Sequence, residues 1–174
     1  MGKLGFTFHM DRCIGCKACQ VACKDKNHLE AGTFFRRVDT VTDGGRPVHF
    51  SGACNHCENP ACVAACPTGA MYLAPDGTVQ HDDGKCIGCG SCVWACPYGA
   101  VSLSRQTGTA VKCNACEDLL KTGQQPACVQ ACITHCLEFG PIEPEQRQAR
   151  TDFLPDPGIT NPTLRIVTGK AGNK

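Results

Sequence analysis

Residues 86–97 read CIGCGSCVWACP and place four cysteines at the spacing C-x2-C-x2-C-x3-C. Residues 13–23, CIGCKACQVAC, repeat that spacing without deviation. Two further groups of four cysteines widen the middle gap, to four residues within 54–66 and to eleven residues within 113–132. The four groups contain sixteen of the seventeen cysteines and leave Cys136 over. Cysteines at this density and regularity are expected to organise the fold.

Each group supplies four candidate ligands for a metal or a metal cluster. They are, in group one, Cys13, Cys16, Cys19 and Cys23; in group two, Cys54, Cys57, Cys62 and Cys66; in group three, Cys86, Cys89, Cys92 and Cys96; and in group four, Cys113, Cys116, Cys128 and Cys132.

The composition leaves little material for a conventional apolar core. The 174 residues are 42% hydrophobic with the cysteines counted, and only 6% aromatic, so groups attached to the cysteines are expected to fill the centre. The formal net charge of +1 argues against a nucleic-acid-binding protein. No apolar run approaches the roughly 18 residues of a membrane span, so the chain is not expected to cross a bilayer.

Three kinds of site could use so many cysteines. A disulfide scaffold is disfavoured because the count is odd, no secretory signal is visible, and close pairs such as Cys13 and Cys16 make poor bridges. A zinc ribbon typically separates two CxxC pairs by a longer loop. The compact runs, with a proline after the fourth cysteine of groups two and three, are typical of bacterial ferredoxins. The sequence therefore predicts cubane [4Fe–4S] clusters, with zinc as the remaining alternative.

The spacing within each group predicts how the clusters are shared. The first three cysteines are expected to lie on a loop that wraps one cubane and directs backbone N–H groups at its sulfurs. The third and fourth cysteines are three residues apart in every group, which on a helix displaces them by about 6 Å along the axis. The fourth thiolate is then expected to serve a neighbouring cubane. The groups would work in pairs, and four groups would hold four clusters.

The segments between the cysteines indicate an α+β fold with little regular structure. Hairpins are predicted around 75–77 and around 107–108, and a first strand over 4–8. Short helices are predicted over 18–25, 61–66, 91–96, 117–121 and 127–132.

The C-terminal segment differs from the rest of the chain. It contains no cysteine after Cys136, three prolines between Leu154 and Pro162, and a possible short helix over 144–150. We expect residues 141–174 to form an extended arm that contributes nothing to the clusters and lies along a partner. Its apolar side chains, which have no evident core to join, are Phe153, Leu154, Leu164, Ile166 and Val167.

The N-terminus shows no apolar stretch of a secretory signal. The pair Arg36-Arg37 lies internally and is interpreted as two surface arginines on a strand. The chain is therefore expected to be made in the cytoplasm, from where it could leave with a partner that carries the signal.

Four segments together resemble the iron–sulfur subunits of molybdopterin oxidoreductases, in particular the electron-transfer subunit of the dimethyl sulfoxide reductase and polysulfide reductase type. They are CIGCKACQVACKD, CNHCENPACVAACPTGA, CIGCGSCVWACPYGA and KCNACEDLLKTGQQPACVQAC. The segments LEFGPI and LPDPGITNPTLRIV are similar as well, so the resemblance covers nearly the whole chain.

The resemblance implies two interlocked ferredoxin-like dicluster units, one over 51–104 and one over 1–50 with 105–140. It implies four ligand sets: Cys54, Cys57, Cys62 and Cys96; Cys86, Cys89, Cys92 and Cys66; Cys13, Cys16, Cys19 and Cys132; and Cys113, Cys116, Cys128 and Cys23. All four cysteines of group three are present, so no three-iron cluster is expected.

The resemblance also implies a molybdopterin-containing catalytic partner, with molybdenum or tungsten, and a membrane anchor that exchanges electrons with quinone. The chain would then be membrane-associated through its complex, on the cytoplasmic or the periplasmic face. A ferredoxin-type component of a cytoplasmic hydrogenase or formate dehydrogenase complex is the first alternative, and a zinc-stapled interaction module is the second. No motif of a catalytic site is visible, so the chain is not expected to be an enzyme on its own.

Several residues near the groups could adjust the clusters. Cys136 is expected to be a small buried apolar residue. His56 could tune a cluster or could be an exposed loop histidine. Positive charge beside a cluster would raise its potential, although cation-rich loops also aid solubility; the cations in question are Arg12, Lys17, Lys24, Lys85 and Lys112.

Overall fold

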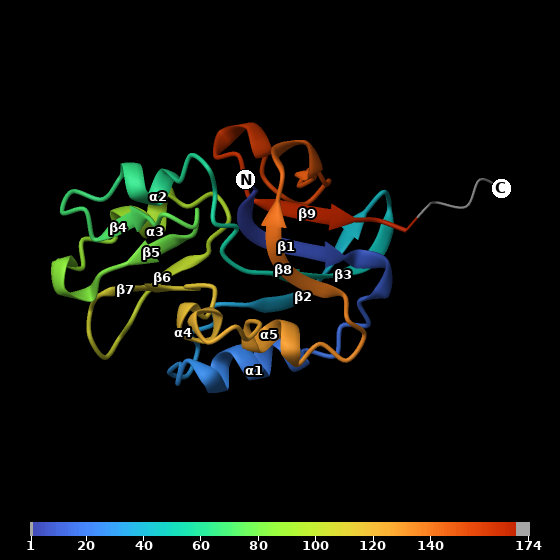
Figure 1. The fold of residues 1–174 in the computed structure, drawn as a ribbon, viewed down its shortest axis with the longest axis horizontal. Coiled ribbons are helices and arrows are strands. Elements are labelled where there is room, and N and C mark those ends of the chain that lie inside the picture. Colours follow the sequence, from blue (N-terminus) through green and yellow to red (C-terminus); the bar gives the residue numbers. More distant parts are fainter. Residues whose placement is uncertain (1, 170–174) are drawn as a thin grey trace.

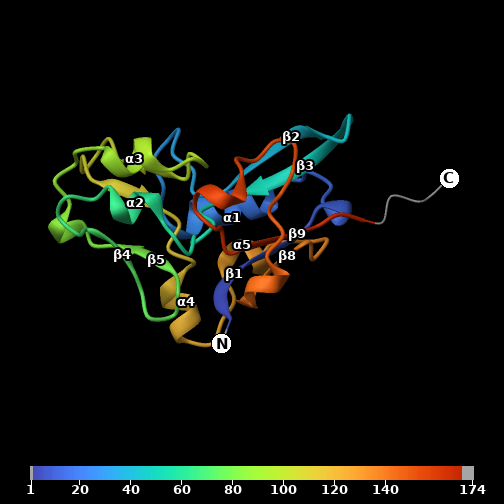
Figure 2. The same ribbon diagram turned by 90° about the horizontal axis from the view of Figure 1, so that it is seen from above.

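The computed structural model describes residues 2–169 (Figure 1), so the last five residues of the predicted arm lie outside the described part. The fold is α+β, as predicted. Figures 1 and 2 show two lobes: one contains the short strands and helices of the middle of the chain, and the other contains both ends of the chain. No helix in the described residues is long and apolar enough to cross a membrane.

A three-stranded sheet joins the two ends of the chain. Strand β1 (Lys3–His9) lies in the middle, β8 (Leu137–Ile142) pairs with it antiparallel, and β9 (Leu164–Val167) pairs with it parallel. The buried face of this sheet carries Phe6 and Phe139, whose rings lie 4.8 Å apart between centroids. The buried side chains of this sheet share one core with cysteines of groups one and four.

The other strands form three separate hairpins. Strands β4 (Met71–Leu73) and β5 (Val79–His81) make one, and β6 (Val101–Leu103) and β7 (Ala110–Lys112) make another, both as predicted. The third, from β2 (Arg37–Asp43) and β3 (Arg46–Gly52), was not predicted. Its turn residues Gly44 and Gly45 both adopt positive φ, which glycine allows without strain.

All five predicted helices are present, with shorter ends in three cases. They are α1 (Ala18–Lys26), α2 (Ala61–Ala64), α3 (Ser91–Ala95), α4 (Glu117–Lys121) and α5 (Ala127–Gln130). Helix α1 packs beside α5, and α2 packs beside α3. This packing brings group one next to group four and group two next to group three.

The expectation that each helix carries both the third and the fourth cysteine is wrong for three groups. Only α1 contains both, Cys19 and Cys23, whereas Cys66, Cys96 and Cys132 follow the ends of their helices. In groups two and three the next residue is proline, which disfavours helical backbone at the residue before it. In these two groups the fourth cysteine therefore lies after the end of the helix and not on it.

The expectation that the C-terminal segment has no core to join is also wrong. Leu164 and Ile166 of β9 are each only 4% exposed, because the parallel pairing with β1 turns them into the core around the first sheet. This contact could not be predicted from the sequence, because the strand is short and its partner strand lies at the other end of the chain. The helix predicted over 144–150 is a single 3-10 turn, Pro144–Gln146, and a second such turn spans Pro157–Ile159.

Candidate iron–sulfur sites

One pocket is lined by cysteines from two different groups. Cys54, Cys57 and Cys62 come from the loop and helix of group two, and Cys96 comes from the end of α3 in group three. Thr160 of the C-terminal segment lines the same pocket. Three cysteines of one group thus meet the fourth cysteine of the neighbouring group.

A second pocket repeats this arrangement with the two groups exchanged. It is lined by Cys86, Cys89 and Cys92 of group three and by Cys66, which follows α2 of group two. The two pockets are related by the exchange of their fourth cysteines. In each pocket the lining cysteines are three of one group and the fourth cysteine of the other group.

Groups one and four also approach each other. Burial and then the charge of Cys128, with a smaller contribution from Cys116, raise the pKa of Cys23 to about 12. Burial raises the pKa of Cys19, and the charges of Cys128 and Cys132 add to it. The fourth cysteine of group one thus lies among thiols of group four.

The thiols of these sites fit a cationic metal cluster as their common partner. Burial is the main cause of raised pKa values at Cys57 and Cys62, each to about 12, with neighbouring cysteines contributing. Buried thiolates that repel one another need positive charge at their centre. Iron–sulfur clusters meet this need, and their thiolates bind different iron atoms of one cubane.

Backbone N–H groups donate to the Sγ atoms of several cysteines. Met71 N–H donates to Cys66 Sγ over 3.5 Å, and Ala100 N–H donates to Cys96 Sγ over 3.4 Å. Equivalent bonds reach Cys86 from Ala110, Cys113 from Ala115 and Cys132 from Cys136. Such bonds stabilise thiolate charge and affect the potential of a bound cluster.

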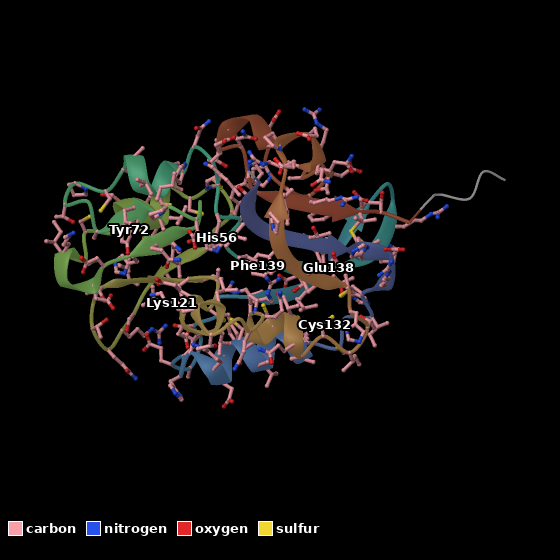
Figure 3. The ribbon with its side chains drawn as sticks, in the orientation of Figure 1. His56, Tyr72, Lys121, Cys132, Glu138 and Phe139 are labelled. Atoms are coloured by element: carbon pink, nitrogen blue, oxygen red, sulfur yellow. The ribbon has the colours of Figure 1, made fainter. Side chains whose placement is uncertain are left out.

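His56 is fully buried (Figure 3), so its interpretation as an exposed loop histidine is wrong. Its Nδ1 accepts a hydrogen bond from Val79 N–H over 3.0 Å, which places the ring proton on Nε2. Burial, with the charges of Lys112 and Arg36, holds the pKa of His56 well below its usual value. The imidazole ring is therefore neutral and packs between the loop of group two and β5.

Cys136 is buried, as predicted, at 3% exposure. Its Sγ lies 3.3 Å from Cys132 Sγ, and its backbone N–H donates to the same sulfur. Burial raises the pKa of Cys136 to about 12. It is a neutral thiol that packs against a candidate ligand.

The cations near the groups fall into two classes. Arg12, Lys17 and Lys85 are exposed and Lys24 is half-buried, whereas Lys112 is 5% exposed and donates to the carbonyl oxygens of Val79 and Cys113. Sequence reasoning missed a second buried cation. Arg36, interpreted above as a surface residue, is 2% exposed.

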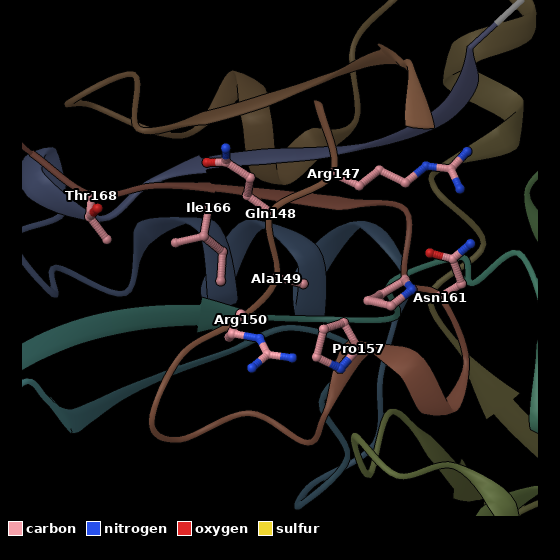
Figure 4. A pocket seen from close by; sticks show the side chains of 9 residues that line it. Arg147, Gln148, Ala149, Arg150, Pro157, Asn161, Ile166 and Thr168 are labelled. Carbon is pink, nitrogen blue, oxygen red and sulfur yellow. The ribbon is translucent and has the colours of Figure 1, made fainter. Parts of the chain in front are cut away.

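A further pocket lies on the C-terminal segment and contains no cysteine (Figure 4). It is lined by Arg147, Arg150, Pro157, Asn161 and Ile166, among others. It is formed where residues 147–150 run beside β9.

Comparison with known families decides the nature of the cysteine sites. The model of a 4Fe-4S dicluster domain matches residues 47–142, and that of a 4Fe-4S binding domain matches residues 10–26. The chain belongs to the 4Fe-4S dicluster family. Membership of the dicluster family confirms the prediction of [4Fe–4S] clusters as cofactors and leaves the zinc alternative without support.

Three relatives of the chain are named as subunits of reductases. The chain is 39% identical to the B subunit of anaerobic dimethyl sulfoxide reductase from Haemophilus influenzae, over 98% of this chain and 91% of the relative. It is 40% identical to the subunit of the same name from Escherichia coli, over 94% and 88%. It is 46% identical to the thiosulfate reductase electron transfer subunit of Salmonella typhi, over 79% and 75%. The resemblance drawn from the four cysteine segments is confirmed.

Proposed function

We propose that the chain is the electron-transfer subunit of a reductase complex and relays single electrons through four [4Fe–4S] clusters. Bound clusters of this type supply one-electron transfer. The observation that carries the proposal is the reciprocal lining of two pockets, in which each set of three cysteines meets the fourth cysteine of the neighbouring group.

The proposed ligand sets follow this reciprocity. The first two sets are Cys54, Cys57, Cys62 and Cys96, and Cys86, Cys89, Cys92 and Cys66. The packing of α1 against α5 supports the same exchange between groups one and four. The remaining sets are then Cys13, Cys16, Cys19 and Cys132, and Cys113, Cys116, Cys128 and Cys23.

Two dicluster units result from these sets, one over 51–104 and one over 1–50 with 105–140. Cys54 and Cys113 lie close enough that the charge of Cys54 raises the pKa of Cys113, after the larger effect of burial. Both cysteines also belong to one buried core cluster, which supports an approach of the two units at their inner clusters. Electrons could therefore pass from one unit to the other through the centre of the chain.

The two outer clusters are proposed to be those with Cys16 and with Cys89 among their ligands. Cys16 and Cys89 are the exposed members of the sixteen candidate ligands. Ile14 beside Cys16 is 59% exposed, and Ile87 and Trp94 near Cys89 are 67% and 90% exposed. Exposed apolar side chains around an exposed ligand suit contact with a partner protein, so these two places are the proposed points of electron entry and exit.

The proposed partners are those that the family resemblance implies: a molybdopterin-containing catalytic subunit, and a membrane anchor that exchanges electrons with quinone. The chain would be membrane-associated through this complex. It would perform no catalysis of its own, and its residues would hold and insulate the clusters. The outward face of residues 141–169, where Ile159 is 60% exposed, is proposed as a further partner contact.

Purification of the native complex tests this function. The chain should co-purify with a molybdopterin protein. When the complex with reduced clusters is mixed with the substrate of that protein, the clusters of the chain should be reoxidised. Co-purification with a hydrogenase instead, or clusters that the substrate does not reoxidise, would contradict the proposal. A variant with Trp94→Ala should retain its iron while losing the exchange with one partner. Tyr72→Ala, at an aromatic side chain that is 42% exposed, is the control.

A further inference from the structure

Arg36 is a buried cation that the cluster-binding motifs do not include. It precedes β2 and is 2% exposed. Its Nη1 donates to Ser51 O over 2.9 Å and to Ser51 Oγ over 3.1 Å. The guanidinium carbon lies 4.4 Å from the centre of the Phe6 ring, over its face. These contacts fix the plane of the guanidinium group against the core of the first sheet.

Two donors of this guanidinium have no partner. Within residues 2–169, neither Nε nor Nη2 makes a hydrogen bond, although both atoms are buried. No ion pair within residues 2–169 includes Arg36, so no carboxylate in these residues balances its charge. Buried donors and buried charges are costly unless an acceptor of opposite charge is present.

Cysteines lie near Arg36: Cys19, Cys23, Cys113 and Cys128 belong to the same buried core as Phe6, over whose ring the guanidinium lies. Burial acts to lower the pKa of Arg36, but the charges of Cys128, Cys113, Cys19 and Cys23 outweigh it and raise that pKa. Cys113, Cys128 and Cys23 belong to one proposed ligand set. Cys19 belongs to the adjacent set. The guanidinium therefore lies near thiols of two proposed ligand sets.

A hydrogen-bonded path links Arg36 to the second site as well. Ser51 Oγ, which accepts from Arg36 Nη1, lies 3.4 Å from Cys19 Sγ. One hydroxyl thus connects the guanidinium to a ligand of the adjacent set. Arg37, the next residue, is exposed and offers no such path.

We propose that Arg36 is a tuning residue whose free Nε and Nη2 donors bind sulfur atoms of the cluster held by Cys113, Cys116, Cys128 and Cys23. This proposal rests on the proposed function, because it requires that cluster. A fixed positive charge beside a cluster stabilises the reduced form, which carries one more negative charge, over the oxidised form. Arg36 therefore holds the potential of this cluster above the value that the thiolates alone would give.

The test compares redox titrations of three variants of the full chain, purified anaerobically and followed by the EPR signals of the reduced clusters. Arg36→Gln removes the charge and keeps one amide donor. Arg36→Lys keeps the charge and loses the planar set of donors. Arg37→Gln removes a charge from the exposed neighbouring position and serves as the matched control. Iron and sulfide are measured in every sample before titration.

If the clusters are retained, Arg36→Gln is expected to lower the midpoint potential of one cluster by about 59 mV. At a fixed potential this corresponds to a tenfold change in the ratio of the oxidised to the reduced form of that cluster. Arg36→Lys should lower the same midpoint less, and Arg37→Gln should leave all midpoints unchanged. If Arg36→Gln does not assemble its clusters, the result for Arg36→Lys decides. Unchanged midpoints in the assembled Arg36 variants overturn the proposal, whereas a wild-type chain without iron overturns the proposed function instead.

Discussion

Deletion of residues 147–174 removes β9 and the segment that lies on the loop of group two. Leu164 and Ile166 leave the core, and burying each such side chain contributes about 1.5–3 kcal/mol. The deletion also removes four hydrogen bonds that involve the backbone of that loop. They run from Thr163 N–H to Asn55 O, from Thr163 Oγ to His56 O, from Asn59 N–H to Thr160 O, and from Glu58 N–H to Asn161 O. Each contributes about 0.5–1.5 kcal/mol.

The summed loss approaches the whole stability of an ordinary domain, about 5–15 kcal/mol. The deleted chain is therefore expected to lose the cluster of the group-two loop or to fail to fold, which reverses the sequence-based expectation that this segment contributes nothing to the clusters. The assay is iron and sulfide per chain after anaerobic purification. A deleted chain with the full iron content of the wild type would refute this reasoning.

A milder pair of variants separates a local effect from general unfolding. Ile166→Ala should reduce the free energy of unfolding by about 2–5 kcal/mol. Ile159→Ala, at a 60% exposed position of the same segment, should change it by no more than about 0.5 kcal/mol. Loss of the cluster absorbance in urea should therefore occur at a lower concentration for Ile166→Ala alone.

Three further predictions concern single positions. Gly5→Ala would push a methyl group into a backbone carbonyl oxygen of the C-terminal segment. It should lower the free energy of unfolding, measured by urea denaturation, by about 1–3 kcal/mol. Gly140 is the partner of Gly5 in the β1–β8 register, and Gly140→Ala should be tolerated because the added methyl group meets open space. Cys96→Ser should alter the EPR signal of the cluster on the group-two loop, and Cys66→Ser that of the group-three loop; the opposite assignment would contradict the reciprocal ligand sets. Cys136→Ala should retain the full iron content, since that thiol is not a proposed ligand, and loss of one cluster would show that it is.

The sequence predicted the parts of the fold that depend on neighbours along the chain. The segments in and beside the cysteine groups located all five helices, and the turns around 75–77 and 107–108 located two hairpins. These features are local because a turn residue or a cluster loop acts within a few positions. The cofactor followed from the same spacing.

The features that sequence reasoning missed depend on distant pairing. Strand β9 has only four residues, and its burial comes from β1, which lies at the other end of the chain. Arg36 looked like a surface residue because arginine is seldom buried without a partner. Its buried position follows from the packing of Phe6 and Ser51 around it and from the nearby thiols, none of which is adjacent in sequence.

Anaerobic metal analysis of the wild-type chain tests the central claim most directly. Four cubanes on sixteen cysteines predict about sixteen iron and about sixteen acid-labile sulfide per chain, without stoichiometric zinc. Iron for only two clusters, or zinc bound in proportion to the chain, would contradict the account.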